Sequence, residues 1–205
     1  RAARAVESGD ATVVACVAGD TNHIDSFRNL LAGFSHFAAD ASNPYGYGGP
    51  NANFAMITDR YMQEFGVSKE DFGTLCIAQR ENALLNPSAL MKNSLTMEEY
   101  LKARKISDPI TLYDCVMPCA GSEAFLVMRR DLAKRLGQPY ARLRSTIERH
   151  NAYSSDPIQL RGGWAMDSQK LWDTANCGPN EIDLLQTYDD YPVISFMQIQ
   201  DLGFC

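Results

Sequence analysis

The segment LLQTYDDYPVISFMQIQDLGFC, residues 184–205, joins two structural patterns within one short stretch. A strand-like apolar run ends in the sequence YDDY (residues 188–191), and Pro192 then suits the first turn of a helix that stops at Gly203. In open α/β sheets, ligands bind beyond the carboxyl ends of the strands. The segment therefore predicts an α/β fold with a candidate site at YDDY.

The same residues have a simpler interpretation. The carboxylates of Asp189 and Asp190 can cap the helix, since side-chain oxygens satisfy the free N–H groups of a first turn. The ring of Tyr188 can then pack against the edge of the sheet. Both interpretations predict a strand over residues 181–190 and a helix from Pro192 onward.

The rest of the chain alternates strand-like and helical patterns. Residues 1–8 have an apolar period typical of a helix that ends at Gly9, and they begin within that pattern, which favours the interior of a larger protein. The run DATVVACVAGD (residues 10–20) predicts a buried parallel strand. Further strands are expected at residues 124–129 and 141–153.

Helical patterns dominate the middle of the sequence, and capping signals mark their starts. Ser68 and Asp71 have capping-box spacing, and Thr96 precedes another helix. The stretch ASNPYGYGGP (residues 41–50) predicts a loop. We expect helices over residues 53–66, 68–85, 96–106, 131–137 and 167–175.

Composition excludes several classes of function. The 205 residues are 45% hydrophobic, which suffices for a core, and the formal net charge of -6 with no basic stripe excludes a nucleic-acid partner. No apolar run is long enough for a membrane span. The six cysteines, several of them inside apolar runs, favour a reducing compartment, so we expect a soluble cytoplasmic protein.

The remaining motifs each have two interpretations. Cys115 and Cys119 lie four residues apart, but without a second pair or a nearby histidine we interpret them as core thiols and predict no metal. Two glycines before Trp164 indicate either close approach of a ligand or a tight turn. Three arginines could bind phosphate or form solvated faces: Arg80, Arg104 and Arg161. The three histidines are interpreted as structural residues: His23, His36 and His150.

Three stretches together resemble the thiolase superfamily, in particular its sterol carrier protein-x and lipid-transfer-protein-type branch. They are RAARAVESGDATVVACVAGD (residues 1–20), ISDPITLYDCVMPCAGSEAFLVM (residues 106–128) and QTYDDYPVISFMQIQDLGFC (residues 186–205). The resemblance spans essentially the whole chain and implies the αβαβα layers of the thiolase fold, here as an internal fragment.

The resemblance also implies a domain organisation. The chain would hold the end of the N-terminal thiolase half, a mostly helical loop domain, a return to the N-terminal half and the start of the C-terminal half. In that order, the four parts are residues 1–40 (end of the N-terminal half), 41–118 (loop domain), 119–138 (return to the N-terminal half) and 139–205 (start of the C-terminal half).

The chemistry implied by the resemblance is making or breaking a carbon–carbon bond in an acyl-CoA. Thiolases act through an acyl-cysteine, whose cysteine would precede residues 1–8, with a histidine base and a second cysteine beyond Cys205. We therefore expect an acetyl-CoA acetyltransferase type of enzyme that is active as the full-length protein, with the fragment itself inactive. The resemblance further implies a coenzyme A thioester as substrate, no covalently bound cofactor, and a homodimer that is cytoplasmic in a bacterium or peroxisomal in a eukaryote.

One position departs from the resembled branch. Tyr188 stands where that branch has the histidine of His-Asp-Cys-Phe and other thiolases have the asparagine of Asn-Glu-Ala-Phe. A phenol with an ordinary pKa of about 10 donates hydrogen bonds better than it accepts protons at neutral pH.

The substitution raises two alternatives. One is a retro-aldolase that cleaves steroid or lipid side-chain acyl-CoA together with an OB-fold partner protein, and the other is a non-catalytic lipid or acyl-CoA binding protein. We predict Tyr188 and Asp189 as catalytic residues, and Trp164, Met166 and Tyr191 as substrate-binding residues.

Overall fold

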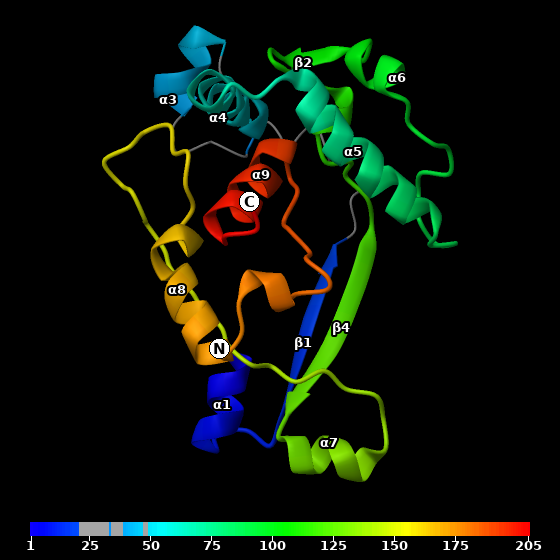
Figure 1. Cartoon of the computed structure of the whole chain (residues 1–205), viewed down its shortest axis with the longest axis vertical. Helices are drawn as coiled ribbons and strands as arrows, with labels where there is room; N and C mark the ends of the chain where they lie inside the picture. Colours follow the sequence, from blue (N-terminus) through cyan, green and yellow to red (C-terminus); the bar gives the residue numbers. More distant parts are fainter. Residues whose placement is uncertain (21–32, 34–38, 47–48) are drawn as a thin grey trace. The chain divides into compact units, whose positions relative to one another are not determined.

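The computed structural model describes residues 1–20, 33, 39–46 and 49–205 (Figure 1). The chain divides into two compact units, residues 1–30 with 117–144 and residues 31–116 with 145–205. The four-part thiolase organisation stays a prediction. The first unit contains α1 (Ala2–Ser8), β1 (Val13–Asp20), β4 (Gly121–Met128) and α7 (Arg130–Leu136).

The first unit is built on an antiparallel ladder between β1 and β4. Val13 lies opposite Met128 and Asp20 lies opposite Gly121, so the eight residues of each strand pair throughout. The predicted strand at 124–129 and the predicted helix at 1–8 are confirmed, and α1 ends at Gly9 with a left-handed φ of 85°.

The prediction of a buried parallel strand at residues 10–20 was wrong. β1 is antiparallel to β4, and its side chains are mostly exposed, Val17 by 72%. A continuous apolar run indicates a strand that can be buried on both faces. Burial itself requires other helices or strands to cover those faces. Among the described residues, β1 pairs with β4 and with no other strand.

The second unit is mostly helical, with α9 packed against both α4 and α5 (Figure 1). Its core includes the buried side chains of Phe72, Tyr100, Ile110 and Val193. β2 and β3 form a short antiparallel pair. The elements are α3 (Ala39–Ser42), η2 (Asn43–Tyr45), α4 (Pro50–Phe65), α5 (Lys69–Leu84), α6 (Met97–Leu101), β2 (Lys105–Ser107), β3 (Ile110–Thr111), η3 (Leu112–Asp114), α8 (Trp164–Ala175), η4 (Pro179–Glu181) and α9 (Pro192–Asp201).

Local capping explains why these helices begin where the sequence indicates. The Ser68 backbone N–H donates to Asp71 Oδ2 at 2.8 Å, and the Asp71 N–H donates back to Ser68 Oγ at 3.3 Å. Thr96 and Glu99 form the same reciprocal pair at the start of α6. Both predicted starts are confirmed, because a capping box needs only residues three positions apart. Within the described part of the chain, no helix is both long and apolar enough to cross a membrane.

The helix expected over residues 96–106 ends at Leu101, and β2 begins at Lys105, because these residues pair with β3. Three other predictions of secondary structure were wrong. Residues 141–153 contain no strand, and residues 181–190 contain only the end of η4. A strand satisfies its backbone through a neighbouring strand, and the described residues provide none beside either run. The loop expected at residues 41–50 contains the helical turns of α3 and η2 in its described part, while residues 47–48 lie outside the described residues.

Candidate functional site

The YDDY segment folds back along α9 and is held there by helix side chains. The Tyr188 N–H donates to Gln198 Oε1 at 3.2 Å, and Gln198 Nε2 donates to the Tyr188 carbonyl at 2.8 Å. One residue earlier, the hydroxyls of Thr187 and Ser195 lie 2.9 Å apart. The side chain of Gln198 thus satisfies backbone groups of Tyr188 that a neighbouring strand would satisfy in a sheet.

The phenol of Tyr188 is the exposed group of this segment. Its side chain is 71% exposed, whereas its backbone is fixed by Gln198. The negative charge of Asp190 raises the pKa of Tyr188, with smaller contributions from burial and from Asp189. The phenol therefore keeps its proton at neutral pH, so that it can donate a hydrogen bond or a proton to a bound molecule.

The two aspartates differ in their surroundings. Asp189 is exposed, whereas Asp190 is half-buried and has a raised pKa because of burial and the adjacent charge of Asp189. No side chain caps α9, whose N-cap residue is Tyr191. The interpretation of both aspartates as helix caps was therefore wrong, and so was the packing of Tyr188 on a sheet edge, since residues 181–190 form no strand.

Asp190 belongs to the candidate site YDDY but is not among the residues that we predicted to be catalytic or substrate-binding. The signal was present as two adjacent carboxylates, because like charges next to each other oppose ionisation. The sequence does not indicate which of the two aspartates is half-buried in the fold. Asp190 is also the group that acts most strongly on the pKa of Tyr188.

We predict that replacing Asp190 by Asn raises the Tm at neutral pH. The folded-state pKa of Asp190 is raised, so its stabilising contribution is complete below the unfolded pKa of about 3.9 and is lost as pH rises through the folded pKa. At neutral pH the wild type holds an unfavourable charge that Asn lacks. Thermal unfolding of both proteins at pH 7 and at about pH 3, where the carboxyl is protonated, measures the difference.

The control for this experiment is Asp183→Asn, which removes an exposed carboxylate from the same connection. We expect the Tm of this variant to equal that of the wild type at neutral pH. A Tm of Asp190→Asn that is lower than wild type at pH 7, or raised equally at both pH values, would contradict the charge-burial explanation.

Tyr191 closes the segment and is buried in the core of the second unit. Its side chain is 2% exposed, its ring stacks on that of Phe54 with centroids 4.2 Å apart, and its hydroxyl donates to Asn51 Oδ1 at 2.6 Å. Burial, with the nearby Cys115 and Asp190, raises the pKa of its phenol. The side chain of Tyr191 is thus held against α4, and a substrate contact of Tyr191 stays a prediction.

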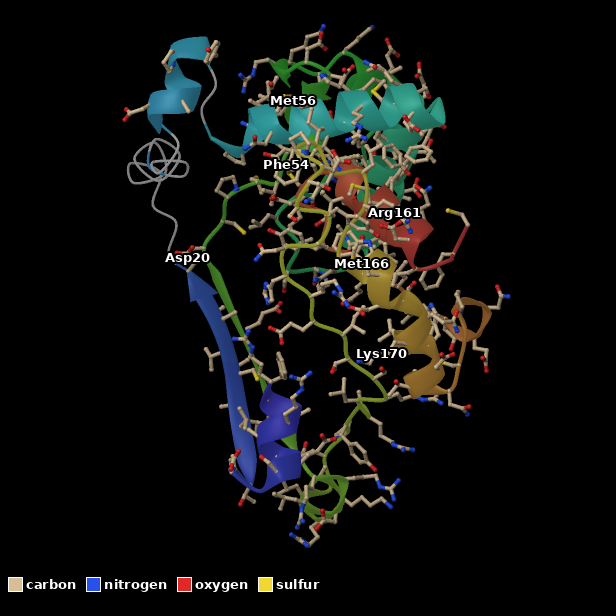
Figure 2. The ribbon with its side chains drawn as sticks, turned by 90° about the vertical axis from the view of Figure 1, so that its left-hand side faces the viewer. Asp20, Phe54, Met56, Arg161, Met166 and Lys170 are labelled. Atoms are coloured by element: carbon tan, nitrogen blue, oxygen red, sulfur yellow. The ribbon has the colours of Figure 1, made fainter. Side chains whose placement is uncertain are left out.

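Trp164 and Met166 lie at the start of α8. The indole N–H of Trp164 donates to Asp201 Oδ2 at 2.9 Å, and Arg161 Nε donates to Asp201 Oδ1 at 3.1 Å. Figure 2 shows Met166 on α8 and Arg161 beside α9; the Met166 side chain is about half exposed. A Cβ on Gly162 would lie 2.1 Å from the Trp164 ring, so a close turn explains this glycine.

None of these contacts joins α8 to Tyr188. The roles of Trp164 and Met166 in substrate binding stay predictions.

The described cysteines and histidines form no metal centre. In the described ranges, no three His, Cys, Asp or Glu side chains gather closely enough to hold an ion, and all six cysteines are free. Burial, followed by the charge of Asp114, raises the pKa of Cys115 to about 11 and that of Cys76 to about 12. These two thiols are therefore poor nucleophiles at neutral pH.

Several of the histidines and arginines considered in the sequence analysis contact other residues of the protein. His150 contacts Glu148 at 3.1 Å, whereas His23 and His36 lie outside the described residues. Arg80 donates to the Asn93 carbonyl at 3.1 Å, and Arg161 is paired with Asp201. Two of the three candidate phosphate-binding arginines thus have partners within the protein.

Comparison with known proteins finds thiolase-like relatives of this chain. The chain is 28% identical over 220 residues to a steroid side-chain-cleaving aldolase of Thermomonospora curvata, covering 100% of this chain and 56% of that protein. It is 26% identical over 155 residues to the benzoylsuccinyl-CoA thiolase subunit BbsB of Thauera aromatica, covering 74% of this chain and 40% of that protein. No family model matches the chain.

A solved structure gives the same result. An Ltp2-ChsH2(DUF35) aldolase superposes with a TM-score of 0.77 at 26% identity, covering 98% of this chain and 54% of that one. The resemblance to the thiolase superfamily is thereby confirmed, and the fold is thiolase-like. The chain spans about half the length of the curated relatives it matches.

Proposed function

We propose that this chain forms part of an acyl-CoA carbon–carbon bond enzyme that performs retro-aldol cleavage of a β-hydroxyacyl-CoA. The observation that carries the proposal is the exposed, protonated phenol of Tyr188 on a backbone fixed by Gln198. The names of the Thermomonospora relative and of the solved structure support an aldolase. This departs from the acetyltransferase type expected from the sequence, which no contact of the described residues favours.

The role of Tyr188 follows from the charges that develop in such a cleavage. A base removes the proton of the β-hydroxyl, the bond between the α and β carbons breaks, and a carbonyl product leaves. The bonding electrons form an enolate whose negative charge lies on the thioester oxygen until the α carbon is protonated. A phenol that stays protonated at neutral pH can donate a hydrogen bond to that oxygen. The charge of Asp190, followed by burial and the charge of Asp189, raises the pKa of Tyr188 above its ordinary value.

The proposed substrate is a steroid or lipid side-chain acyl-CoA, and the proposed partner is an OB-fold protein. Both extend to this chain what the names of its relatives say of those proteins, a steroid side-chain cleavage and a complex with a DUF35 protein. The acyl-CoA enters as substrate, and no resident cofactor is required by the proton transfers described above.

Thiolysis is the second candidate, because one relative is named as a thiolase subunit. This reaction needs a thiolate that attacks the thioester or ketone carbonyl. Burial raises the pKa of both Cys76 and Cys115, so neither suits that task. An acyl-cysteine would then have to form on another cysteine.

Two parallel assays separate the candidates. The protein as its gene encodes it, co-purified with its OB-fold partner, is supplied with a steroid side-chain β-hydroxyacyl-CoA without free CoA, or with the β-ketoacyl-CoA plus CoA. We expect cleavage of the β-hydroxyacyl-CoA to a carbonyl product and a shorter acyl-CoA. Strictly CoA-dependent cleavage of the β-ketoacyl-CoA alone would favour thiolysis, and binding without either reaction would favour the non-catalytic alternative.

A further inference from the structure

Two buried tyrosines join α4 to α9, and only Tyr191 lies close to Tyr188 in the sequence. Tyr61 is 4% exposed and donates to Gln200 Oε1 at 2.7 Å, near the end of α9. Tyr191 is 2% exposed and donates to Asn51 Oδ1 at 2.6 Å, at the beginning of α9. Both hydroxyls thus form the same type of bond, to a side-chain amide oxygen.

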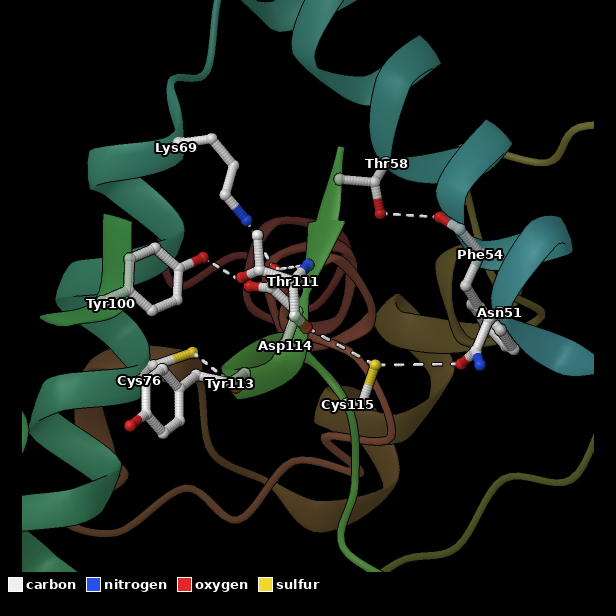
Figure 3. Close-up of polar contacts among 10 residues, drawn as sticks. All are labelled: Asn51, Phe54, Thr58, Lys69, Cys76, Tyr100, Thr111, Tyr113, Asp114 and Cys115. Atoms are coloured by element: carbon white, nitrogen blue, oxygen red, sulfur yellow. Dashed lines mark hydrogen bonds and ion pairs between the residues drawn. The ribbon is translucent and has the colours of Figure 1, made fainter. Parts of the chain in front are cut away.

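The acceptor of the Tyr191 hydroxyl is itself held in place. Asn51 lies in the first turn of α4, and Phe54 lies three residues later on the same face of that helix. One helix face therefore receives both the ring and the hydroxyl of Tyr191. The thiol of Cys115 also donates weakly to Asn51 Oδ1 at 3.8 Å, and Figure 3 shows Asn51 with Phe54 and Cys115 around it.

The YDDY segment is thus fixed at two points three residues apart. Gln198 holds the backbone of Tyr188 from α9, and Asn51 holds the side chain of Tyr191 from α4. Between these points Asp189 is exposed and Asp190 is half-buried. If the Tyr191 bond is lost, its hydroxyl no longer joins this end of the segment to α4, and we expect the phenol of Tyr188 to gain freedom to move.

We propose that Asn51 and Tyr191 are positioning residues, which fix the phenol of Tyr188 for catalysis through the hydrogen bond between them. The proposal rests on the proposed function of Tyr188. A misplacement of about 1 Å can cost on the order of 100-fold in rate, so a bond that touches no substrate can still control turnover.

The test compares kcat, KM and Tm of Tyr191→Phe and Tyr61→Phe in the full-length protein with its partner. Each substitution removes one buried hydroxyl and keeps the ring, so both should lower the Tm by a similar few degrees. We expect kcat of Tyr191→Phe to fall about tenfold or more, with KM changed by less than about twofold, and kcat of Tyr61→Phe to stay at the wild-type value. Asn51→Leu, which removes the acceptor of the same bond, should reproduce the loss of kcat seen in Tyr191→Phe.

A double variant identifies the residue through which Tyr191 acts. If Tyr191 acts by placing Tyr188, the variant Tyr188→Phe/Tyr191→Phe has the same kcat as Tyr188→Phe alone. Independent, multiplicative losses would overturn the proposal. So would a kcat of Tyr191→Phe no lower than that of Tyr61→Phe, provided that Tyr188→Phe itself is impaired.

Two measurements keep this proposal separable from the proposed function. An unimpaired Tyr188→Phe would overturn the function assigned to Tyr188, and with it the positioning role. Amide hydrogen exchange of Tyr188, whose N–H is bonded to Gln198, reports the order of the segment without any substrate. We expect faster exchange in Tyr191→Phe than in Tyr61→Phe. Equal exchange rates would overturn the positioning role of Tyr191, whatever kcat the two variants have.

Discussion

Replacing Tyr188 by Phe is expected to lower kcat for retro-aldol cleavage by about 100-fold or more while leaving the free energy of unfolding unchanged. The substitution removes one oxygen from a ring that is 71% exposed, and it keeps the backbone bonds to Gln198. The loss therefore measures hydrogen-bond or proton donation to the enolate alone. Steady-state kinetics with the β-hydroxyacyl-CoA and denaturant unfolding of both proteins provide the two readings.

The dependence of this reaction on pH follows from the same group. The pKa of Tyr188 is raised, so the phenol stays protonated up to and beyond the ordinary tyrosine pKa of about 10. A proton donor is active below its pKa, so the Tyr188-dependent part of kcat should hold constant through neutral pH and fall only above that value. Tyr45→Phe is the matched control, because Tyr45 is 86% exposed and lies in η2.

An unchanged kcat for Tyr188→Phe would remove Tyr188 from the chemistry. A loss of kcat that Tyr45→Phe reproduces would point to a general effect on the protein.

Replacing Asp114 by Ala is expected to destabilise the second unit by about 3–5 kcal/mol. The carboxylate of Asp114 is 4% exposed and accepts from Lys69 Nζ at 2.5 Å, from the Thr111 N–H at 2.7 Å and from the hydroxyl of Tyr100, as Figure 3 shows. These donors come from α5, from β3 and from α6. Removing the carboxylate leaves the mostly buried ammonium of Lys69 and the fully buried phenol of Tyr100 without their acceptor.

Urea unfolding measures this change as a lower midpoint with an unchanged m value. The control is Lys105→Ala, which breaks the exposed ion pair with Asp108, whose side chains are 71% and 72% exposed. Such a pair contributes little, so we expect a midpoint close to that of the wild type. Equal midpoints for Asp114→Ala and Lys105→Ala would contradict the role of Asp114 as the acceptor that joins three elements.

The helices could be predicted from the sequence because their determinants are local. Ser68 and Asp71 meet across one turn, and Gly9 and Gly66 end helices through their own left-handed φ values of 85° and 68°. The strands could not be predicted equally well, because a strand depends on a partner distant in sequence. The antiparallel partner of Val13 is Met128, and no local pattern in residues 10–20 specifies it.

The candidate site was predicted in part for the same reason. The change of pattern at YDDY indicated where Tyr188 would lie, before a helix that begins at Pro192. The support of that segment could not be inferred, because Tyr191 meets Asn51 across 140 residues of sequence. The difference between Asp189 and Asp190 was likewise hidden, since it depends on burial by the fold.

The way in which Gln198 binds residue 188 bears on how chemistry diverges within a fold. Its two bonds to residue 188 go to main-chain atoms, which every amino acid at this position except proline would provide. The side chain of residue 188 can consequently be exchanged while its support is retained. A histidine, an asparagine or a tyrosine could occupy the same place, so a few nucleotide changes in one codon would suffice to begin the conversion of one reaction into another.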